Sequence, residues 1–249
     1  MCLLCFNTAW GQEKIVTHTR YIGIGYNSMQ DTYLSPMHYA GTELRYISHT
    51  TRERRDTLGT PAPWSRLIIS EGMLSQGKSR SENGSTLGGS YHFQYGMLHS
   101  WRLLADRLTI KAGGQAEGLL GFLYNTRNGN NPAQMRLSMD LGPAISASFP
   151  IGRVHLEYEA SAPLVGLCFS PNYGQSYYEI FSQGNYDHNC VPTTIVSTPS
   201  LRHMLTANFR LWNMNLSVGY LGDYSQQSVN NLKQHVYSHC FVIGLKPHI

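Results

Sequence analysis

Two acidic residues and two histidines fall in segments that the sequence predicts as loops, where they could together activate a water molecule. They are Asp31, His38, Asp187 and His188. An aspartate that orients an imidazole can make it a general base, which is the chemistry of a hydrolase. Asp187 and His188 are neighbours, however, and neighbouring side chains point apart on an extended chain. Asp and His in loops more often form turns or face solvent. We therefore expect no enzyme, and keep a rim-active hydrolase as an alternative.

Metal and cofactor chemistry has no complete motif in this chain. His188 and Cys190 in the segment DHNC provide two ligands, and no CxxC or HExxH accompanies them. His235 and His239 are four residues apart, which on a strand separates them by about 13 Å, too far to hold one ion. The sequence predicts no cofactor and no metal.

The cysteines beyond the N-terminal segment are Cys168, Cys190 and Cys240. Cys168 and Cys190 flank the same long polar segment, so a disulfide between them would close that loop in an oxidising compartment. The alternative is three unpaired thiols, because a sequence does not supply the Cα separation that a disulfide requires.

The elements that must position these residues are suggested by the composition. Charged residues make up 14% of the 249 residues, against roughly a quarter in soluble domains. Mean hydropathy is nevertheless −0.28, and no run approaches the roughly 18 apolar residues of a spanning helix. Low charge without long apolar runs favours membrane-spanning β-strands. The net charge of +4 is small and scattered, so the chain is not expected to bind nucleic acid.

Alternation of apolar and polar residues predicts the strands. Most of the alternating segments reach the nine to eleven residues that a tilted strand needs to cross a bilayer. Short and long connections take turns along the chain, as in outer-membrane barrels, although residues 52–64 form a long connection where a short turn is expected. The pattern predicts an all-β fold, an up-and-down antiparallel barrel of about ten strands with both termini in the periplasm. The segments are 17–27, 39–51, 64–75, 86–98, 107–120, 133–149, 153–167, 200–211, 214–225 and 234–246.

One hairpin, LRHMLTANFRLWNMNLSVGYLGDY (201–224), assigns faces to this pattern. In a barrel the apolar set faces lipid and the polar set faces the lumen. Leu205 and Val218 are therefore predicted to face outward, while Ser217 and Asp223 face inward. Trp212 marks a periplasmic turn with an aromatic side chain at the bilayer interface.

The N-terminal segment MCLLCFNTAWGQ has a short apolar run followed by small residues. This is typical of the end of a secretory signal. We expect residues 1–12 to be a signal-peptide remnant and residues 13–249 to be a single barrel domain in the bacterial outer membrane.

Three segments carry a family resemblance: RYIGIGYN (20–27), TYLSPMHYAGTELRYISH (32–49) and HCFVIGLK (239–246). With them the chain resembles a family of small, uncharacterised outer-membrane barrels of Bacteroidetes, catalogued as a domain of unknown function. The resemblance implies fold and location, and it carries no catalytic residues.

A period of two along each predicted strand gives a set of polar residues that must face the lumen, because a charge facing lipid at midplane costs about 2–4 kcal/mol. Acids and bases are nearly balanced in this set, so they should pair and plug a narrow lumen. A narrow pore or channel is the alternative. The predicted lumen residues are Glu43, Arg45, Glu71, Lys111, Gln115, Glu117, Arg136, Asp140, Glu157, Glu159, Arg202, Arg210 and Asp223.

The segment 170–200 is predicted as a large outer loop with aromatic anchors of the kind that recognition surfaces use. We therefore expect an accessory or interaction subunit of an outer-membrane protein complex. Its expected partners are outer-membrane lipid, lipopolysaccharide, and other outer-membrane or periplasmic proteins. The aromatic residues are Tyr173, Tyr177, Tyr178, Phe181 and Tyr186.

Overall fold

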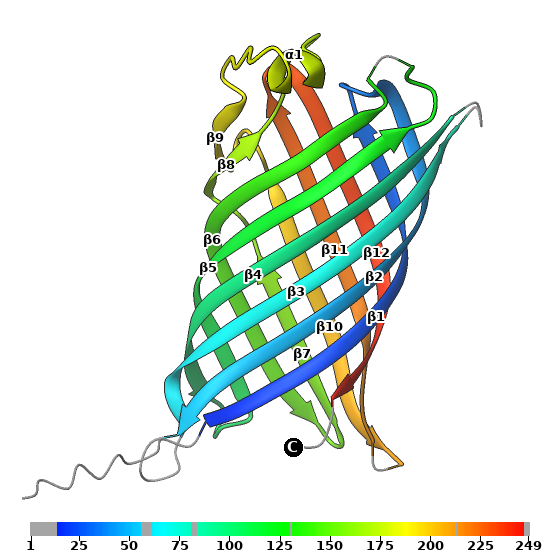
Figure 1. Cartoon of the computed structure of the whole chain (residues 1–249). Helices are drawn as coiled ribbons and strands as arrows, with labels where there is room; N and C mark the ends of the chain where they lie inside the picture. The colour runs from blue at the N-terminus through cyan, green and yellow to red at the C-terminus, as the bar shows by residue number, and fades with distance from the viewer. Residues whose placement is uncertain (1–13, 56–60, 81–83, 130, 213, 247–249) are drawn as a thin grey trace, which may run out of the picture.

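A computed structural model describes residues 14–55, 61–80, 84–129, 131–212 and 214–246, and ten of its strands close into an antiparallel barrel (Figure 1). Neighbours along the chain pair with one another, β7 pairs with β10, and β1 pairs with β12 to close the ring. The predicted antiparallel ten-stranded barrel is confirmed. The wall strands are β1 (Lys14–Asp31), β2 (Ser35–Arg55), β3 (Pro61–Ser79), β4 (Ser85–Leu103), β5 (Leu108–Asn125), β6 (Ala133–Ile151), β7 (Val154–Ser161), β10 (Ser200–Leu211), β11 (Met214–Val229) and β12 (Leu232–Lys246).

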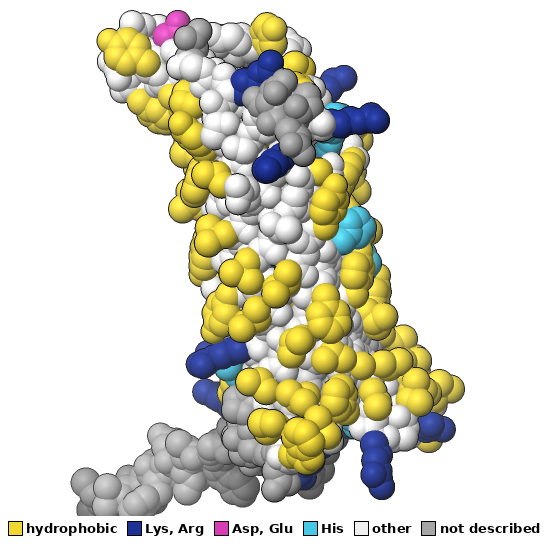
Figure 2. All heavy atoms as spheres, turned by 90° about the vertical axis from the view of Figure 1, so that its right-hand side faces the viewer, with side chains coloured by type: hydrophobic (Ala, Val, Ile, Leu, Met, Phe, Trp, Pro, Cys, Tyr) yellow, Lys and Arg dark blue, Asp and Glu magenta, His cyan; other side chains and the backbone are white. Residues whose placement is uncertain are grey.

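Side chains along the strands alternate between the apolar outer surface of the barrel and its buried interior. In β12, Phe241, Ile243 and Leu245 are 50–58% exposed, whereas Cys240 and Val242 are buried. Figure 2 shows the same arrangement over a whole face: hydrophobic side chains cover the middle of the barrel, and Lys and Arg gather near both ends. This outside is that of an outer-membrane-type barrel.

Among the described residues, no helix has the length and apolar character needed to cross a membrane.

The seam between the first and last strands depends on a close fit. Tyr21 and Gly244 are paired across it. A Cβ added at Gly244 would lie 2.4 Å from Cδ1 of Tyr21, so the ring occupies the space that a side chain would need. The missing Cβ thus lets an inward aromatic ring cover the closing strand pair.

The connection between β1 and β2 is shorter than the sequence predicted. Residues 28–38 were expected to form a loop, yet β1 continues to Asp31 and β2 begins at Ser35. The turn is tight because Asp31 caps it: its carboxylate accepts a hydrogen bond from the Tyr33 backbone N–H, and its carbonyl accepts one from the Leu34 N–H. The strands therefore continue above the apolar band.

The predicted strand 153–167 is two elements. β7 ends at Ser161, and the chain leaves the wall around Pro163, which has no backbone N–H to give to a strand ladder. It then forms β8 (Val165–Phe169), which pairs with the outer half of β6 and with β9 (Cys190–Thr194). This hairpin and the short helix α1 (Tyr177–Phe181) stand at the end of the barrel opposite both chain ends (Figure 1). The expected large loop thus holds an extra hairpin.

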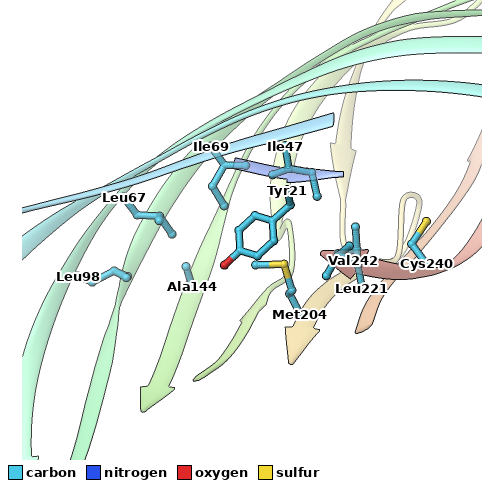
Figure 3. Close-up of a cluster of buried hydrophobic side chains, with 10 residues drawn as sticks. All are labelled: Tyr21, Ile47, Leu67, Ile69, Leu98, Ala144, Met204, Leu221, Cys240 and Val242. Carbon is cyan, nitrogen blue, oxygen red and sulfur yellow. The ribbon is translucent and has the colours of Figure 1, made fainter. Parts of the chain in front are cut away.

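The interior also contains a layer of apolar side chains, whereas the sequence analysis expected a polar lumen. The layer lies between the walls of the barrel, with side chains from strands on different sides pointing toward one another (Figure 3). A smaller cluster that includes Met29, Tyr39 and Leu123 lies toward the end of the barrel that carries α1. Alternation alone does not distinguish a small or apolar side chain that faces the interior from one that faces lipid. The layer consists of Tyr21, Ile47, Leu67, Ile69, Leu98, Ala144, Met204, Leu221, Cys240 and Val242.

Candidate functional site: the ion-pair layer and the chamber above it

A network of charged side chains crosses the middle of the barrel. Arg45 on β2 donates from Nε to Glu43 at 2.8 Å, and from Nη1 to Glu71 at 2.5 Å and Asp223 at 2.7 Å. Arg202 on β10 donates to the other carboxylate oxygen of Glu71. Arg45, Glu43 and Glu71 are each about 3% exposed or less. Buried charges of this kind persist only when each has a partner, and here one guanidinium joins three carboxylates.

The strand order shows that this network spans the lumen. β3, which holds Glu71, and β10, which holds Arg202, are five places apart in the ring of ten. They are therefore on opposite walls. A second pair, His49 on β2 and Glu159 on β7, is also five places apart and meets at 3.0 Å. Side chains from opposite walls therefore meet across the described interior at two levels.

Glu43 has a full set of partners besides Arg45. Its carboxylate accepts hydrogen bonds from Asn27 Nδ2 at 3.2 Å, from Ser238 Oγ at 2.7 Å and from the Cys240 thiol at 2.6 Å. These donors come from β1 and β12, the two strands of the closing seam. The carboxylate therefore ties the seam to β2, as a buried acceptor must be satisfied to avoid a large desolvation cost.

A small polar chamber lies on the side of the network toward the β8–β9 hairpin. Its volume is about 110 Å³, enough for several water molecules. Arg136 enters it with one long hydrogen bond, 3.5 Å from Nη2 to Ser225 Oγ. Nε of Arg202 is buried and finds no hydrogen-bond partner among the described residues. Glu117 and Asp140 line the same space.

The predicted lumen residues occupy three levels. Glu43, Arg45, Glu71, Arg202 and Asp223 form the network. Glu117, Arg136 and Asp140 line the chamber, where Gln115 also donates to Glu117 at 2.9 Å. Toward the other end, Lys111 pairs with Glu53 at 2.5 Å, Glu159 with His49, Glu157 is half-buried and Arg210 is exposed.

The prediction omitted His49, Glu53 and His92. His49 and Glu53 share the inward face of β2 with Glu43 and Arg45, so the period of two extended by a few residues includes them. His92 on β4 lies 3.8 Å from Glu117. Its neighbours Tyr91 and Phe93 face outward, so the same period of two predicts that His92 faces inward.

The loop aspartates and histidines do not assemble into a catalytic cleft. Asp187 and His188 were expected to point apart, yet His188 Nδ1 lies 2.7 Å from Asp187 Oδ1. The cause is a left-handed backbone at His188, with φ of 49°, which turns the chain. Both side chains are well over two-thirds exposed. His38 packs against His235, with ring centroids 5.0 Å apart, and Asp31 is buried in its turn.

The proposed disulfide is wrong. Cys168 and Cys190 are both free, the first buried and the second exposed. Cys168 pairs with Val191, and Cys190 pairs with Phe169. The two cysteines are thus one residue out of register on neighbouring strands, which puts their side chains on opposite faces. Among the described residues there is also no group of three or more His, Cys, Asp or Glu side chains arranged to hold a metal.

The five loop aromatics divide into two groups. Tyr177 packs against Phe169 and Phe181, and its hydroxyl donates to Gln134 Oε1 at 2.8 Å. Phe181 is held in this stack while one face remains open. Tyr173, Tyr178 and Tyr186 are 65–74% exposed. Of the five loop aromatics, these three are the most exposed.

One family model and several solved structures are similar to this chain. A family model described as a protein of unknown function, DUF3316, matches residues 5–249. A search of curated proteins finds no match. Among solved structures, neisserial surface protein A is 9% identical, with 92% of this chain and 97% of that chain covered and a TM-score of 0.33. The transport unit of the Escherichia coli autotransporter AIDA-I is 8% identical, with 99% and 93% covered and a TM-score of 0.44. Ail of Yersinia pestis, solved with the heparin analogue sucrose octasulfate, is 13% identical, with 91% and 98% covered and a TM-score of 0.20.

Proposed function

We propose that this chain, which belongs to the DUF3316 family of proteins of unknown function, is a non-conducting outer-membrane barrel that serves as an interaction subunit. In this proposal the termini are periplasmic, and the end with α1 and the β8–β9 hairpin faces outward. The barrel anchors the protein, and its outer end does the binding. Other outer-membrane or periplasmic proteins are the expected partners.

The contact between Glu71 and Arg202 is the observation that carries this proposal. It joins opposite walls of a ring of ten strands, and the apolar layer adds a second barrier on the side of the termini. An ion crossing this path would have to separate buried charge pairs and then pass dehydrated through apolar side chains. Both steps are costly in a low-dielectric interior.

The outer end is built as a fixed surface. Ser176 and Glu179 form a capping box at the start of α1: the Ser176 Oγ accepts from the Glu179 N–H, and the Glu179 carboxylate accepts from the Ser176 N–H. These hydrogen bonds also lower the pKa of Glu179. Tyr173, Tyr178 and Tyr186 project around this anchored helix. Exposed aromatics held by a rigid base are typical of binding surfaces.

Planar-bilayer recording tests the closed lumen. The purified wild-type protein should show no discrete channel openings. The double variant Glu71→Ala/Arg202→Ala removes the cross-wall contact and should raise ionic leakage, while Asp187→Ala on the exposed outer segment should stay silent. Stable unitary openings from the wild-type protein would instead favour the pore.

Site-specific photocrosslinking tests the binding surface. A crosslinker at Tyr178 in native outer membranes should give one discrete adduct with a protein partner. The same crosslinker in a Tyr173→Ser/Tyr186→Ser background should give much less of it, whereas a crosslinker at Trp212, at the opposite end, should not give it. An adduct pattern that is the same at both ends would contradict the proposal.

A further inference from the structure

An apolar depression runs along the outside of β2–β6 below the outer rim. It comprises two adjoining spaces of about 720 Å³ and about 820 Å³. Leu44, Leu74 and Phe122 line both spaces, so they form one continuous depression. At Gly72 a Cβ would meet no atom within 4 Å, and here the floor is the bare backbone of the wall.

Two aromatic rings make this floor a slot. Gly72 is paired with Tyr46 on β2 and with Tyr91 on β4. Both tyrosines face outward and are about half exposed, at 50% and 49%. The slot at Gly72 therefore lies between two outward tyrosines of the neighbouring strands. Its narrow and apolar shape suits an extended hydrocarbon chain better than a folded protein surface.

Basic side chains stand directly above the depression. Gln76 lines its outer end, and Lys78 is the next outward residue on β3, about 7 Å further along the strand. Arg80 follows, and His38 lies on the neighbouring strand β2. Lys78 and Arg80 are exposed and form no ion pair with the described residues. Figure 2 shows Lys and Arg gathered at this end, above the hydrophobic band.

One part of the barrel wall carries almost no basic residues. Between residues 137 and 201 the sequence has a single Lys or Arg, Arg153. It lies in the β6–β7 turn, at the end that holds the chain termini. Lys78 and Arg80, which form no ion pair with the described residues, therefore have no counterpart in residues 137–201 apart from Arg153.

We propose that this surface binds lipopolysaccharide of the outer leaflet, with its phosphate groups at Lys78 and Arg80 and one acyl chain in the slot over Gly72. The assignment rests on the proposed function, because that function places this end of the barrel outside. Cations beside a membrane attract anionic headgroups. Two adjoining apolar spaces accept several chains of one molecule, which favours a multiply acylated glycolipid over a two-chain phospholipid.

Binding to defined lipids tests this proposal. The full chain in detergent is titrated with diphosphorylated hexa-acyl lipid A, with its dephosphorylated form and with phosphatidylglycerol, and affinity is measured by native mass spectrometry. Lys78→Gln/Arg80→Gln should weaken binding of the phosphorylated lipid about 30-fold and leave the dephosphorylated lipid unchanged. Gly72→Phe fills the slot and should weaken binding of both. Arg66→Gln, outward on the same strand at the other end, should change neither.

Three results would overturn the proposal: equal affinity of the wild-type protein for lipid A with and without phosphates, an equal loss in Arg66→Gln, or phosphatidylglycerol bound as tightly as lipid A. Folding of each variant is checked by heat-modifiable migration on gels. If the double variant misfolds, Lys78→Gln alone replaces it, with an expected loss of about fivefold. Because lipid affinity is measured in detergent, this result does not depend on whether the lumen conducts.

Discussion

Arg45 holds three carboxylates in the barrel interior, so its replacement leaves negative charge without compensation. Removing one partner of a buried ion pair costs about 3–5 kcal/mol. Arg45→Met keeps most of the apolar stem and should lower the free energy of unfolding by that amount. Urea unfolding in lipid vesicles, followed by tryptophan fluorescence, measures it. Arg153→Met, in an exposed turn, serves as the control and should change stability by less than about 0.5 kcal/mol.

Asp31 should make stability depend on pH. It lies in the outer turn, beyond the apolar band, and burial raises its pKa to about 6, although hydrogen bonds from Tyr33 and Gln234 act in the opposite direction. The folded protein therefore binds this proton more tightly than the unfolded chain does. Stability from this group is present below about pH 4, is lost as the pH rises to about 6, and is constant above.

The size of this effect is at most on the order of 3 kcal/mol, and Asp31→Asn should remove it. Comparing the urea midpoints of the wild-type protein and the variant between pH 4 and pH 7.5 isolates the contribution of Asp31. Two pH profiles of the same slope would show that the carboxylate keeps its ordinary pKa in the folded protein.

Sequence alternation could place single residues on a face but could not pair them. Glu71 and Arg202 were both predicted to face inward, and both lie in the interior. Their contact joins residues 131 positions apart, and it depends on the closure of the ring, which no local pattern contains. The same limit explains the wrong disulfide: proximity along the loop suggested Cys168 and Cys190, whereas the register of β8 and β9 separates their faces.

Among the elements, the closing seam between β1 and β12 depends most clearly on one position. Gly244→Val would place a Cβ 2.4 Å from the Tyr21 ring, which must then move and open the seam. We expect weaker closure, seen as heat-modifiable migration lost at a temperature several degrees lower. Gly72→Val is the matched control, since its Cβ would meet no atom within 4 Å. Equal effects of the two substitutions would show that the seam has no special role.

The wall strands could be predicted because each combines a regular period with turn signals. The β8–β9 hairpin could not, because each of its strands has five residues, and a polar segment rich in turn-forming residues separates them. The predicted strands were also too short at their ends. Polar positions such as Gln30 and Gln76 resemble loop residues in the sequence, yet they continue the ladder above the apolar band.

At the scale of the molecule, strand length and apolar band describe how the barrel would sit in a membrane. β2 has 21 residues, which at the usual tilt gives a wall about 50 Å high. The bilayer core is about 30 Å thick. In a bilayer the wall would therefore extend past the core, and the Asp31 turn, α1, Lys78 and Arg80 would lie in the part beyond it.

The same geometry predicts which side chains meet lipid. On β10 and β11, Leu205 faces outward and Val218 lies on the outward face, whereas Thr206 and Ser217 are buried inside at 2% and 0% exposure. Spin labels at the first two positions in proteoliposomes should be relaxed by oxygen, which concentrates in lipid, more than by a water-soluble nickel complex. Labels at Thr206 and Ser217 should be protected from both reagents. If Leu205 and Val218 responded only to the nickel complex, their face would meet water, and the barrel would not be embedded in the bilayer at these positions.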